Sequence, residues 1–285
     1  MGDILHFSHA NGFPVGTYRK LFAALEGQFE IRAVDRFGHD PRYPVTRGWP
    51  YLVDELLAAI TERYREPVWL AGHSLGGFLS LMAALRAPER VKGVVMLDSP
   101  IIAGWRARVL RMAQTLGLDE RPSPAYRTKT RRTHWNDADA VWQHFKVKPN
   151  FSRWDEEVLR DYAQHATEPT GRADERTLRF QRDIEYRIYR TLPTRLGRRV
   201  AAGTPFPVAF VAGTRSRELR QCGLTATRRL VGPRLRYLDG SHLFPMERPL
   251  DTAAAIRALI DEMRAGPVRA IAPLHGEAGS GLPGR

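Results

Sequence analysis

Short apolar runs and amphipathic stretches alternate along the first hundred residues, and this alternation limits the chain to few folds. Four runs are apolar enough to form strands: 4–9, 29–35, 67–73 and 91–98. Three intervening stretches carry apolar side chains at helical spacing: 17–27, 51–64 and 75–87. This alternation predicts an α/β fold, with a mostly parallel central sheet covered by helices on both faces.

The alternation stops at about residue 101 and resumes after residue 201. The intervening segment has helical stretches, such as 154–166, but no convincing buried strand. Strands and helices are predicted again at 207–213, 217–231, 234–240 and 249–265. We therefore expect a core built from residues 1–100 and 202–265, with a helical insertion over 101–201. The last twenty residues, 266–285, are rich in Gly and Pro and are expected to be disordered.

The formal net charge of +13 is the unusual feature of the composition. Such a charge can indicate a nucleic-acid partner or an anionic surface. However, the arginines are spread over most of the chain, and no helix-turn-helix, zinc-finger or aromatic RNA-binding signature accompanies them. We therefore attribute the charge to biased amino-acid usage and do not expect nucleic-acid binding.

The remaining bulk features concern location and cofactors. No apolar run approaches the length of a membrane span, and the amino terminus lacks the pattern of a secretory signal. The single cysteine, Cys222, excludes an internal disulfide, which fits a cytoplasmic location. No cluster of Cys and His has metal-ligand spacing, so we expect no metal site.

The stretch LAGHSLGG contains a G-x-S-x-G pattern, with Ser74 between Gly72 and Gly76, at the junction of a predicted strand and helix. A serine at such a turn has a strained backbone that exposes its hydroxyl at the carboxyl end of the sheet. The amide of Leu75 and the dipole of the following helix favour negative charge beside it. Ser74 is therefore the candidate nucleophile; the alternative is a tight turn with an incidental serine.

With this motif, the sequence resembles the α/β-hydrolase fold superfamily over about residues 4–265, and 101–201 stands where that family carries its cap. The resemblance implies a nucleophile, an acid and a histidine in this chain order. It places the histidine in the loop after the last core strand, where His242 lies, so we predict His242 as the catalytic base. His73, beside Ser74, is expected to point away from the serine and to pack.

The stretch FSHANGFP matches the oxyanion loop of that family, usually written H-G-x-P or H-G-x-G, although Ala10 stands where glycine is usual. The resemblance implies that one backbone N–H of this loop joins that of Leu75 to hold the oxyanion. We expect the donor at Asn11, with Gly12 or Phe13 as alternatives. The competing interpretation is a plain turn after a strand.

The acid has two candidates in the sequence, and the remaining alternative is another residue or no acid at all. In most of the family it follows the penultimate core strand, but here Ser216 stands at that position and Glu218 lies two residues further on. Other members carry the acid at the end of the preceding strand, and Asp98 ends that strand in this sequence. We favour Asp98 and keep Glu218 as the alternative, because an aspartate without a catalytic role is common at this strand end.

These residues together predict a cofactor-free serine hydrolase that acts on a small ester through an acyl-enzyme on Ser74. A serine nucleophile argues against the haloalkane dehalogenase and epoxide hydrolase branches, which use aspartate. The alternatives are C–C bond hydrolysis, perhydrolysis or hydroxynitrile lyase chemistry on the same residues, and a non-catalytic receptor that keeps the pocket. Four tryptophans of the insertion either line a substrate pocket or, more commonly, pack within the cap: Trp105, Trp135, Trp142 and Trp154.

Overall fold

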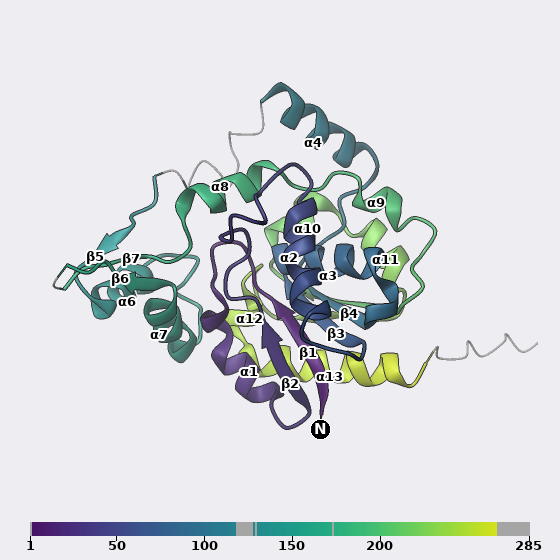
Figure 1. The fold of residues 1–285 in the computed structure, drawn as a ribbon, viewed down its shortest axis with the longest axis horizontal. Helices are drawn as coiled ribbons and strands as arrows, with labels where there is room; N and C mark the ends of the chain where they lie inside the picture. Colours follow the sequence, from purple (N-terminus) through teal and green to yellow (C-terminus); the bar gives the residue numbers. More distant parts are fainter. Residues whose placement is uncertain (1, 118–127, 129, 173, 267–285) are drawn as a thin grey trace, which may run out of the picture.

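The core of the computed structural model is a six-stranded sheet of order β2-β1-β3-β4-β8-β9, in which every pairing is parallel. Figure 1 labels the first four strands of this sheet. The structure describes residues 2–117, 128, 130–172 and 174–266. The strands are β1 (Asp3–Ser8), β2 (Phe29–Ala33), β3 (Val68–His73), β4 (Val91–Leu97), β8 (Val208–Gly213) and β9 (Leu235–Leu238). The parallel sheet predicted from the sequence is confirmed, with each strand within two residues of its expected position.

Helices cover both faces of this sheet because the strands are apolar on both sides. Along β4, Val95 and Leu97 face one hydrophobic cluster, whereas Val94 and Met96 face another. The first cluster includes apolar side chains of α1 (Arg19–Leu25) and α13 (Pro249–Arg264). The second includes those of α2 (Pro50–Thr61), α3 (Leu75–Arg86) and α11 (Thr225–Val231).

The shorter core helices lie at the loops around the sheet. They are η1 (Val15–Tyr18), η2 (Pro88–Arg90), α10 (Arg217–Cys222) and α12 (Phe244–Glu247). The sequence predicted one helix over 217–231, but the structure has two, α10 and α11. The break follows from Gly223, whose φ of 76° lies in the left-handed region that ends a helix.

The described part of residues 101–201 adds a layer of helices and short strands outside the central sheet (Figure 1). Most of its buried apolar side chains belong to the same two hydrophobic clusters as those of the core. Its helices are α4 (Gly104–Leu116), α6 (Ala138–Lys146), α7 (Glu156–His165), α8 (Arg182–Arg190) and α9 (Leu196–Arg199). It also contains an antiparallel sheet that the sequence did not predict, formed by β5 (His134–Trp135), β7 (Arg176–Leu178) and β6 (Thr167–Pro169). Strands of two or three residues are too short to produce a recognisable alternation.

This layer is anchored to the core by polar and aromatic contacts. The Asp155 carboxylate accepts hydrogen bonds from Lys20 Nζ, at 2.9 and 3.0 Å, and the Asp155 N–H donates to the carbonyl of Met246 at 3.0 Å. Trp154 packs in a cluster of rings that includes Phe13 of the loop after β1, with centroids 5.7 Å apart. The structure therefore gives Trp154 a packing role, whereas Trp105 is 61% exposed.

Two further sequence predictions concern membrane spans and the carboxyl-terminal tail. Among the residues that the structure describes, no helix combines the length and the apolar character needed to cross a bilayer. The tail predicted to be disordered, 266–285, lies outside the described residues except for Gly266.

Candidate active site

Ser74 occupies the turn between β3 and α3, with φ 53° and ψ −114°, a conformation that non-glycine residues rarely adopt. Backbones approach so closely here that only glycine fits on either side. A Cβ on Gly72 would lie 2.2 Å from the carbonyl carbon of Gly76, and a Cβ on Gly76 would lie 1.9 Å from the carbonyl oxygen of Ser8. The turn therefore has the strained geometry that its sequence pattern predicts.

A hydrogen-bonded chain joins Ser74 to His242 and Asp98. The Nε2 atom of His242 lies 3.0 Å from the Ser74 hydroxyl, and its Nδ1 atom lies 2.7 Å from a carboxylate oxygen of Asp98. The carboxylate can only accept, so the Nδ1–H donates to Asp98 and Nε2 accepts from Ser74. The loop between β9 and α12 brings His242 to this position. The structure thus unites three residues that lie far apart in the sequence.

Asp98 directly follows β4 and is completely buried. Its backbone has a φ of 46°, which turns the chain out of the strand. Besides His242, its carboxylate accepts hydrogen bonds from the Gly213 N–H at 2.9 Å and the Ser216 hydroxyl at 2.5 Å. Ser216, at the position where the family usually carries its acid, therefore donates a hydrogen bond to Asp98.

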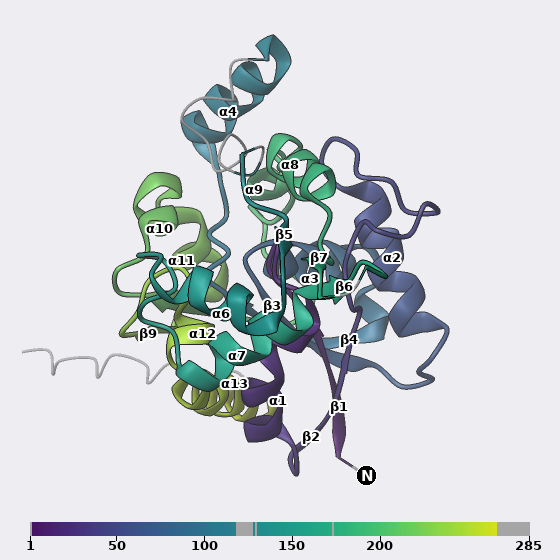
Figure 2. The ribbon, with the colours of Figure 1, turned by 90° about the vertical axis from the view of Figure 1, so that its left-hand side faces the viewer.

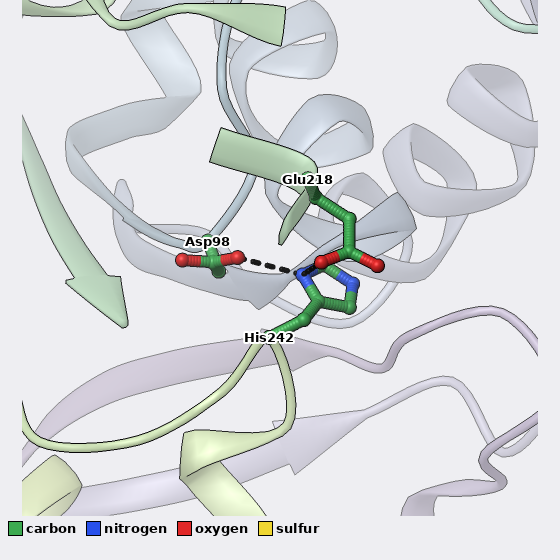
Figure 3. A group of neighbouring side chains, drawn as sticks. All are labelled: Asp98, Glu218 and His242. Atoms are coloured by element: carbon green, nitrogen blue, oxygen red, sulfur yellow. Dashed lines mark hydrogen bonds and ion pairs between the residues drawn. The ribbon is translucent and has the colours of Figure 1, made fainter. Parts of the chain in front are cut away.

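Glu218, the other candidate acid, stands beside the imidazole on α10 (Figure 3). One of its carboxylate oxygens lies 3.9 Å from Nδ1 of His242, beyond hydrogen-bond distance, and its side chain is 43% exposed. Since Nδ1 carries a single proton and directs it to Asp98, Glu218 contributes charge rather than a hydrogen bond. The geometry thus favours Asp98 over Glu218 as the partner of His242.

The pKa of His242 reflects these two carboxylates. Burial alone lowers the pKa of the imidazole, because it disfavours the charged form. The hydrogen bond and charge of Asp98, with the added charge of Glu218, outweigh burial and raise the pKa above its ordinary value. The site therefore stabilises the imidazolium, the form that a histidine takes after accepting a proton.

The predicted oxyanion loop forms a tight turn between β1 and η1. The Phe13 N–H donates to the carbonyl of Ala10 at 3.1 Å, which leaves it unsuited to a bound oxyanion. Within the described part of the chain, the N–H groups of Asn11 and Gly12 have no acceptor. The N–H of Leu75 lies in the first turn of α3, where helical amides have no intrahelical partner. Asn11, Gly12 and Leu75 remain the candidate donors.

Helix α8 of the inserted layer contacts the loop between β1 and η1 and restrains it. The Asn11 side-chain amide donates to the carbonyl of Glu185 at 3.0 Å, and a Cβ on Gly12 would lie 2.8 Å from the Glu185 carboxylate. Glu185 is itself buried and paired with Arg131 at 2.8 Å. Burial raises the pKa of Glu185, and the Arg131 charge opposes that shift. These two residues were not expected from the sequence, since their pairing depends on packing between distant segments.

A second buried chain runs behind the site through His73, which was expected only to pack. His73 Nε2 lies 2.8 Å from the backbone carbonyl of His242, so it donates, and Nδ1 then accepts from the Tyr18 hydroxyl at 2.9 Å. The Tyr18 oxygen in turn accepts the Ala10 N–H at 3.0 Å. Burial holds the pKa of His73 well below its ordinary value, which keeps it neutral. This chain links the backbone of His242 to the oxyanion loop.

One group in the described residues has metal-ligand chemistry, and it is the site itself. Ligand atoms of Asp98, Glu218 and His242 lie within 4.8 Å of one another. An ion held by all three would replace the Nδ1 proton of His242 and break its hydrogen bond to Asp98. The Asp98 carboxylate already accepts hydrogen bonds from Gly213, Ser216 and His242. The arrangement therefore suits proton transfer through His242 better than it suits metal binding.

Comparison with known proteins identifies the family of the chain. Residues 6–255 match the model described as the alpha/beta hydrolase family. The chain belongs to this family. The family and its esterase relatives support a hydrolase, without specifying the bond that is cleaved.

Two curated relatives match over part of their length. Monoglyceride lipase of Rattus norvegicus is 30% identical over 108 residues, which are 35% of this chain and 36% of the lipase. Pimeloyl-[acyl-carrier protein] methyl ester esterase of Aliivibrio salmonicida is 28% identical over 109 residues, or 37% of this chain and 41% of the esterase. The chain is therefore matched to less than half the length of either relative.

Solved structures share the fold over nearly the whole chain. E-2-(acetamidomethylene)succinate hydrolase has a TM-score of 0.71 at 22% identity and covers 92% of each chain. The thioesterase domain from the curacin biosynthetic pathway has a TM-score of 0.63 at 19% identity, covering 90% of this chain and 91% of its own. At these identities the likeness establishes the α/β-hydrolase fold alone.

Replacing Tyr18 with phenylalanine tests the buried chain behind the site. Tyr18→Phe leaves the Ala10 N–H and His73 Nδ1 buried without a partner, so we expect the free energy of unfolding to fall by about 1–3 kcal/mol. Urea unfolding followed by circular dichroism measures this loss. Tyr51→Phe, at a tyrosine that is 43% exposed, is the control and should change stability little. Equal stability of the two variants would contradict the proposed hydrogen-bond chain.

Replacing Glu218 with glutamine tests its electrostatic effect on the imidazole. Removing an anion 3.9 Å from Nδ1 removes an interaction that favours the imidazolium, so Glu218→Gln should lower the pKa of His242. An NMR titration of the histidine ring protons measures the shift. Glu89→Gln in η2, at the opposite end of β4 from Asp98, should leave that pKa unchanged. A pKa that stays constant in Glu218→Gln would remove Glu218 from the site.

Proposed function

We propose that the protein is a serine hydrolase that cleaves carboxylic esters through an acyl-enzyme on Ser74. The observation that carries the proposal is the continuous chain from the Ser74 hydroxyl through His242 to the buried carboxylate of Asp98, with links of 3.0 and 2.7 Å. This arrangement lets a weak nucleophile lose its proton as it attacks a carbonyl carbon. None of these steps requires a cofactor.

In the first half of the reaction, Ser74 Oγ attacks the ester carbonyl while His242 Nε2 takes the hydroxyl proton. The imidazolium that forms is stabilised by Asp98, and the elevated pKa of His242 favours this transfer. The tetrahedral intermediate collapses when His242 returns the proton to the leaving alcohol. In the second half, His242 takes a proton from a water molecule as that water attacks the acyl carbon. His242 then returns the proton to Ser74 Oγ as the bond to the acyl group breaks and the carboxylic acid leaves.

The oxygen that gains negative charge during each attack is held by backbone amides. We assign this role to the N–H groups of Leu75 and Asn11, with Gly12 as the alternative. Such donors are preorganised for a charge that develops only in the transition state, and one is worth about 10²–10³-fold in rate. The contact between α8 and Asn11 supports this assignment, because it restrains the loop that carries the donor.

Esters are favoured over the other reactions of this fold because both curated relatives bear names of ester-cleaving enzymes, one a lipase and one a methyl ester esterase. C–C bond hydrolysis, perhydrolysis and cyanohydrin cleavage use the same residues and remain alternatives. A receptor without catalysis does not need the serine–imidazole–carboxylate chain. We also propose a cytoplasmic location, because Cys222, the one cysteine of the chain, is free.

We propose that residues 101–201 act as a cap that selects the substrate. Its α8 contacts the oxyanion loop through Asn11, and its ring cluster packs on Phe13 of the same loop. Side chains on the cap therefore adjoin the region where the acyl group would lie. Its buried tryptophans, Trp135 and Trp154, hold this layer together rather than reach solvent.

An active-site probe tests the nucleophile. The native protein should react covalently with a fluorophosphonate, and Ser74→Ala should not, because the probe needs an activated serine hydroxyl. Ser80→Ala, which changes a buried serine on α3, is the matched control and should label normally. Labelling is read by mass spectrometry. A folded native protein that fails to react would favour the non-catalytic receptor.

Asp98→Asn tests the acid. The asparagine amide can donate to Nδ1 and so favours the wrong imidazole tautomer, which should reduce turnover by about 10⁴-fold. Turnover is measured on p-nitrophenyl esters of increasing acyl length, a series that also reveals the preferred acyl group. Glu218→Gln should keep most of its turnover. Near-normal turnover in Asp98→Asn, with an inactive Glu218→Gln, would transfer the role of the acid to Glu218.

A further inference from the structure

Helix α4 exposes a stripe of large apolar side chains to solvent. Trp105, Val109, Met112 and Leu116 are 61%, 49%, 60% and 62% exposed. Their spacing of four, three and four residues places them on one face of the helix. They are half of the large apolar side chains that are exposed in the described residues. An apolar face of this kind usually marks a surface that another structure covers.

An ordinary surface helix turns its apolar face to the protein, but α4 turns its large apolar side chains to solvent. Its buried side chains are Ala107 and Gln114, a small residue and a polar one. Gln114 holds the helix against the protein through two hydrogen bonds. Its side-chain amide donates to the backbone carbonyl of Leu192 at 3.1 Å, and its backbone carbonyl accepts from the Arg47 side chain at 3.2 Å. At about 100° per residue, these two positions lie opposite the apolar stripe. Both views show α4 projecting from the body of the molecule (Figures 1 and 2).

The charges of α4 are all positive. The helix carries Arg106, Arg108 and Arg111 and has no acidic residue. Arg106 and Arg108 are exposed and border the stripe on its two sides, and the guanidinium of Arg106 lies 4.8 Å from the ring of Trp105. The surface that covers this stripe must therefore be apolar in its interior and negatively charged around it.

We propose that α4 docks the protein on an anionic lipid surface, with the helix lying in the plane of the membrane. Apolar side chains, with an aromatic ring among them, enter the acyl boundary in this mode of binding, while arginines at the edges meet anionic headgroups. Trp105 has the amphipathic ring that this interface favours. This mode needs no membrane-spanning helix, and it does not depend on the proposed catalysis.

A second copy of the chain fits the stripe less well. Packing two α4 helices along their stripes would bring Arg106 and Arg108 of one copy close to those of the other, with no acid on the helix to balance them. The charge pattern thus favours a lipid surface over self-association.

Vesicle flotation tests the proposal. The native protein should float with vesicles of phosphatidylcholine and phosphatidylglycerol in equal parts, and bind vesicles of phosphatidylcholine alone at least tenfold more weakly. Val109→Ser with Leu116→Ser should reduce binding to the anionic vesicles by at least tenfold. The matched control makes the same changes at exposed sites elsewhere, Val147→Ser with Leu250→Ser, and should bind as the native protein does.

Each other outcome overturns the proposal. It is wrong if the native protein does not float with anionic vesicles, if the control loses binding equally, or if anionic lipid gives no advantage. Analytical ultracentrifugation that finds a dimer abolished by the α4 variant would identify a second copy as the occupant. A large drop in melting temperature for the α4 variant alone would mean that the chain itself covers the stripe. Failure of Ser74 to label would leave the flotation result unaffected.

Discussion

A buried carboxylate organises the candidate site. Burial of an ionised carboxyl group costs several kcal/mol unless hydrogen bonds replace its water. Asp98 receives three such bonds, two from Gly213 and Ser216 at the end of β8 and one from His242 after β9. Because the carboxylate can only accept, it determines which nitrogen of His242 carries the proton, and thereby leaves the other nitrogen free to accept from Ser74. Stability and site geometry therefore rest on the same charge.

The parallel sheet explains why these groups meet. The carboxyl ends of parallel strands lie along one edge, so Ser74 after β3, Asp98 after β4 and Ser216 after β8 are neighbours without further adjustment. The chain from His242 through His73 and Tyr18 then ties the loop after β9 to the loop after β1. The site is thus fixed from the strand ends beneath it and from loops on both sides.

Features set by local pattern were predictable from the sequence, and features set by distant packing were not. The core strands and the turn at Ser74 have periodic or motif signals, and both were recognised. The sequence favours Asp98 over Glu218 as the acid, but chain order does not show which carboxylate reaches Nδ1 of His242. The distances to Nδ1, 2.7 Å from Asp98 and 3.9 Å from Glu218, do show it. The contact between Glu185 and the loop after β1 had no sequence signal, and neither had the short strands β5–β7, since each depends on residues far away in the chain.

Helix α8 of the inserted layer makes more contacts with the core than helix α4 does. Helix α8 meets the core through buried polar contacts at Asn11 and Gly12, whereas α4 turns only Ala107 and Gln114 inward. Leaving four large apolar side chains in water forgoes stabilisation of about 25 cal/mol for each Å² that could be buried. The opposite face of α4 presents only a small residue and a polar one to the rest of the protein. A stripe that faces away from the protein is therefore explained by something that binds it, rather than by the stability of the fold.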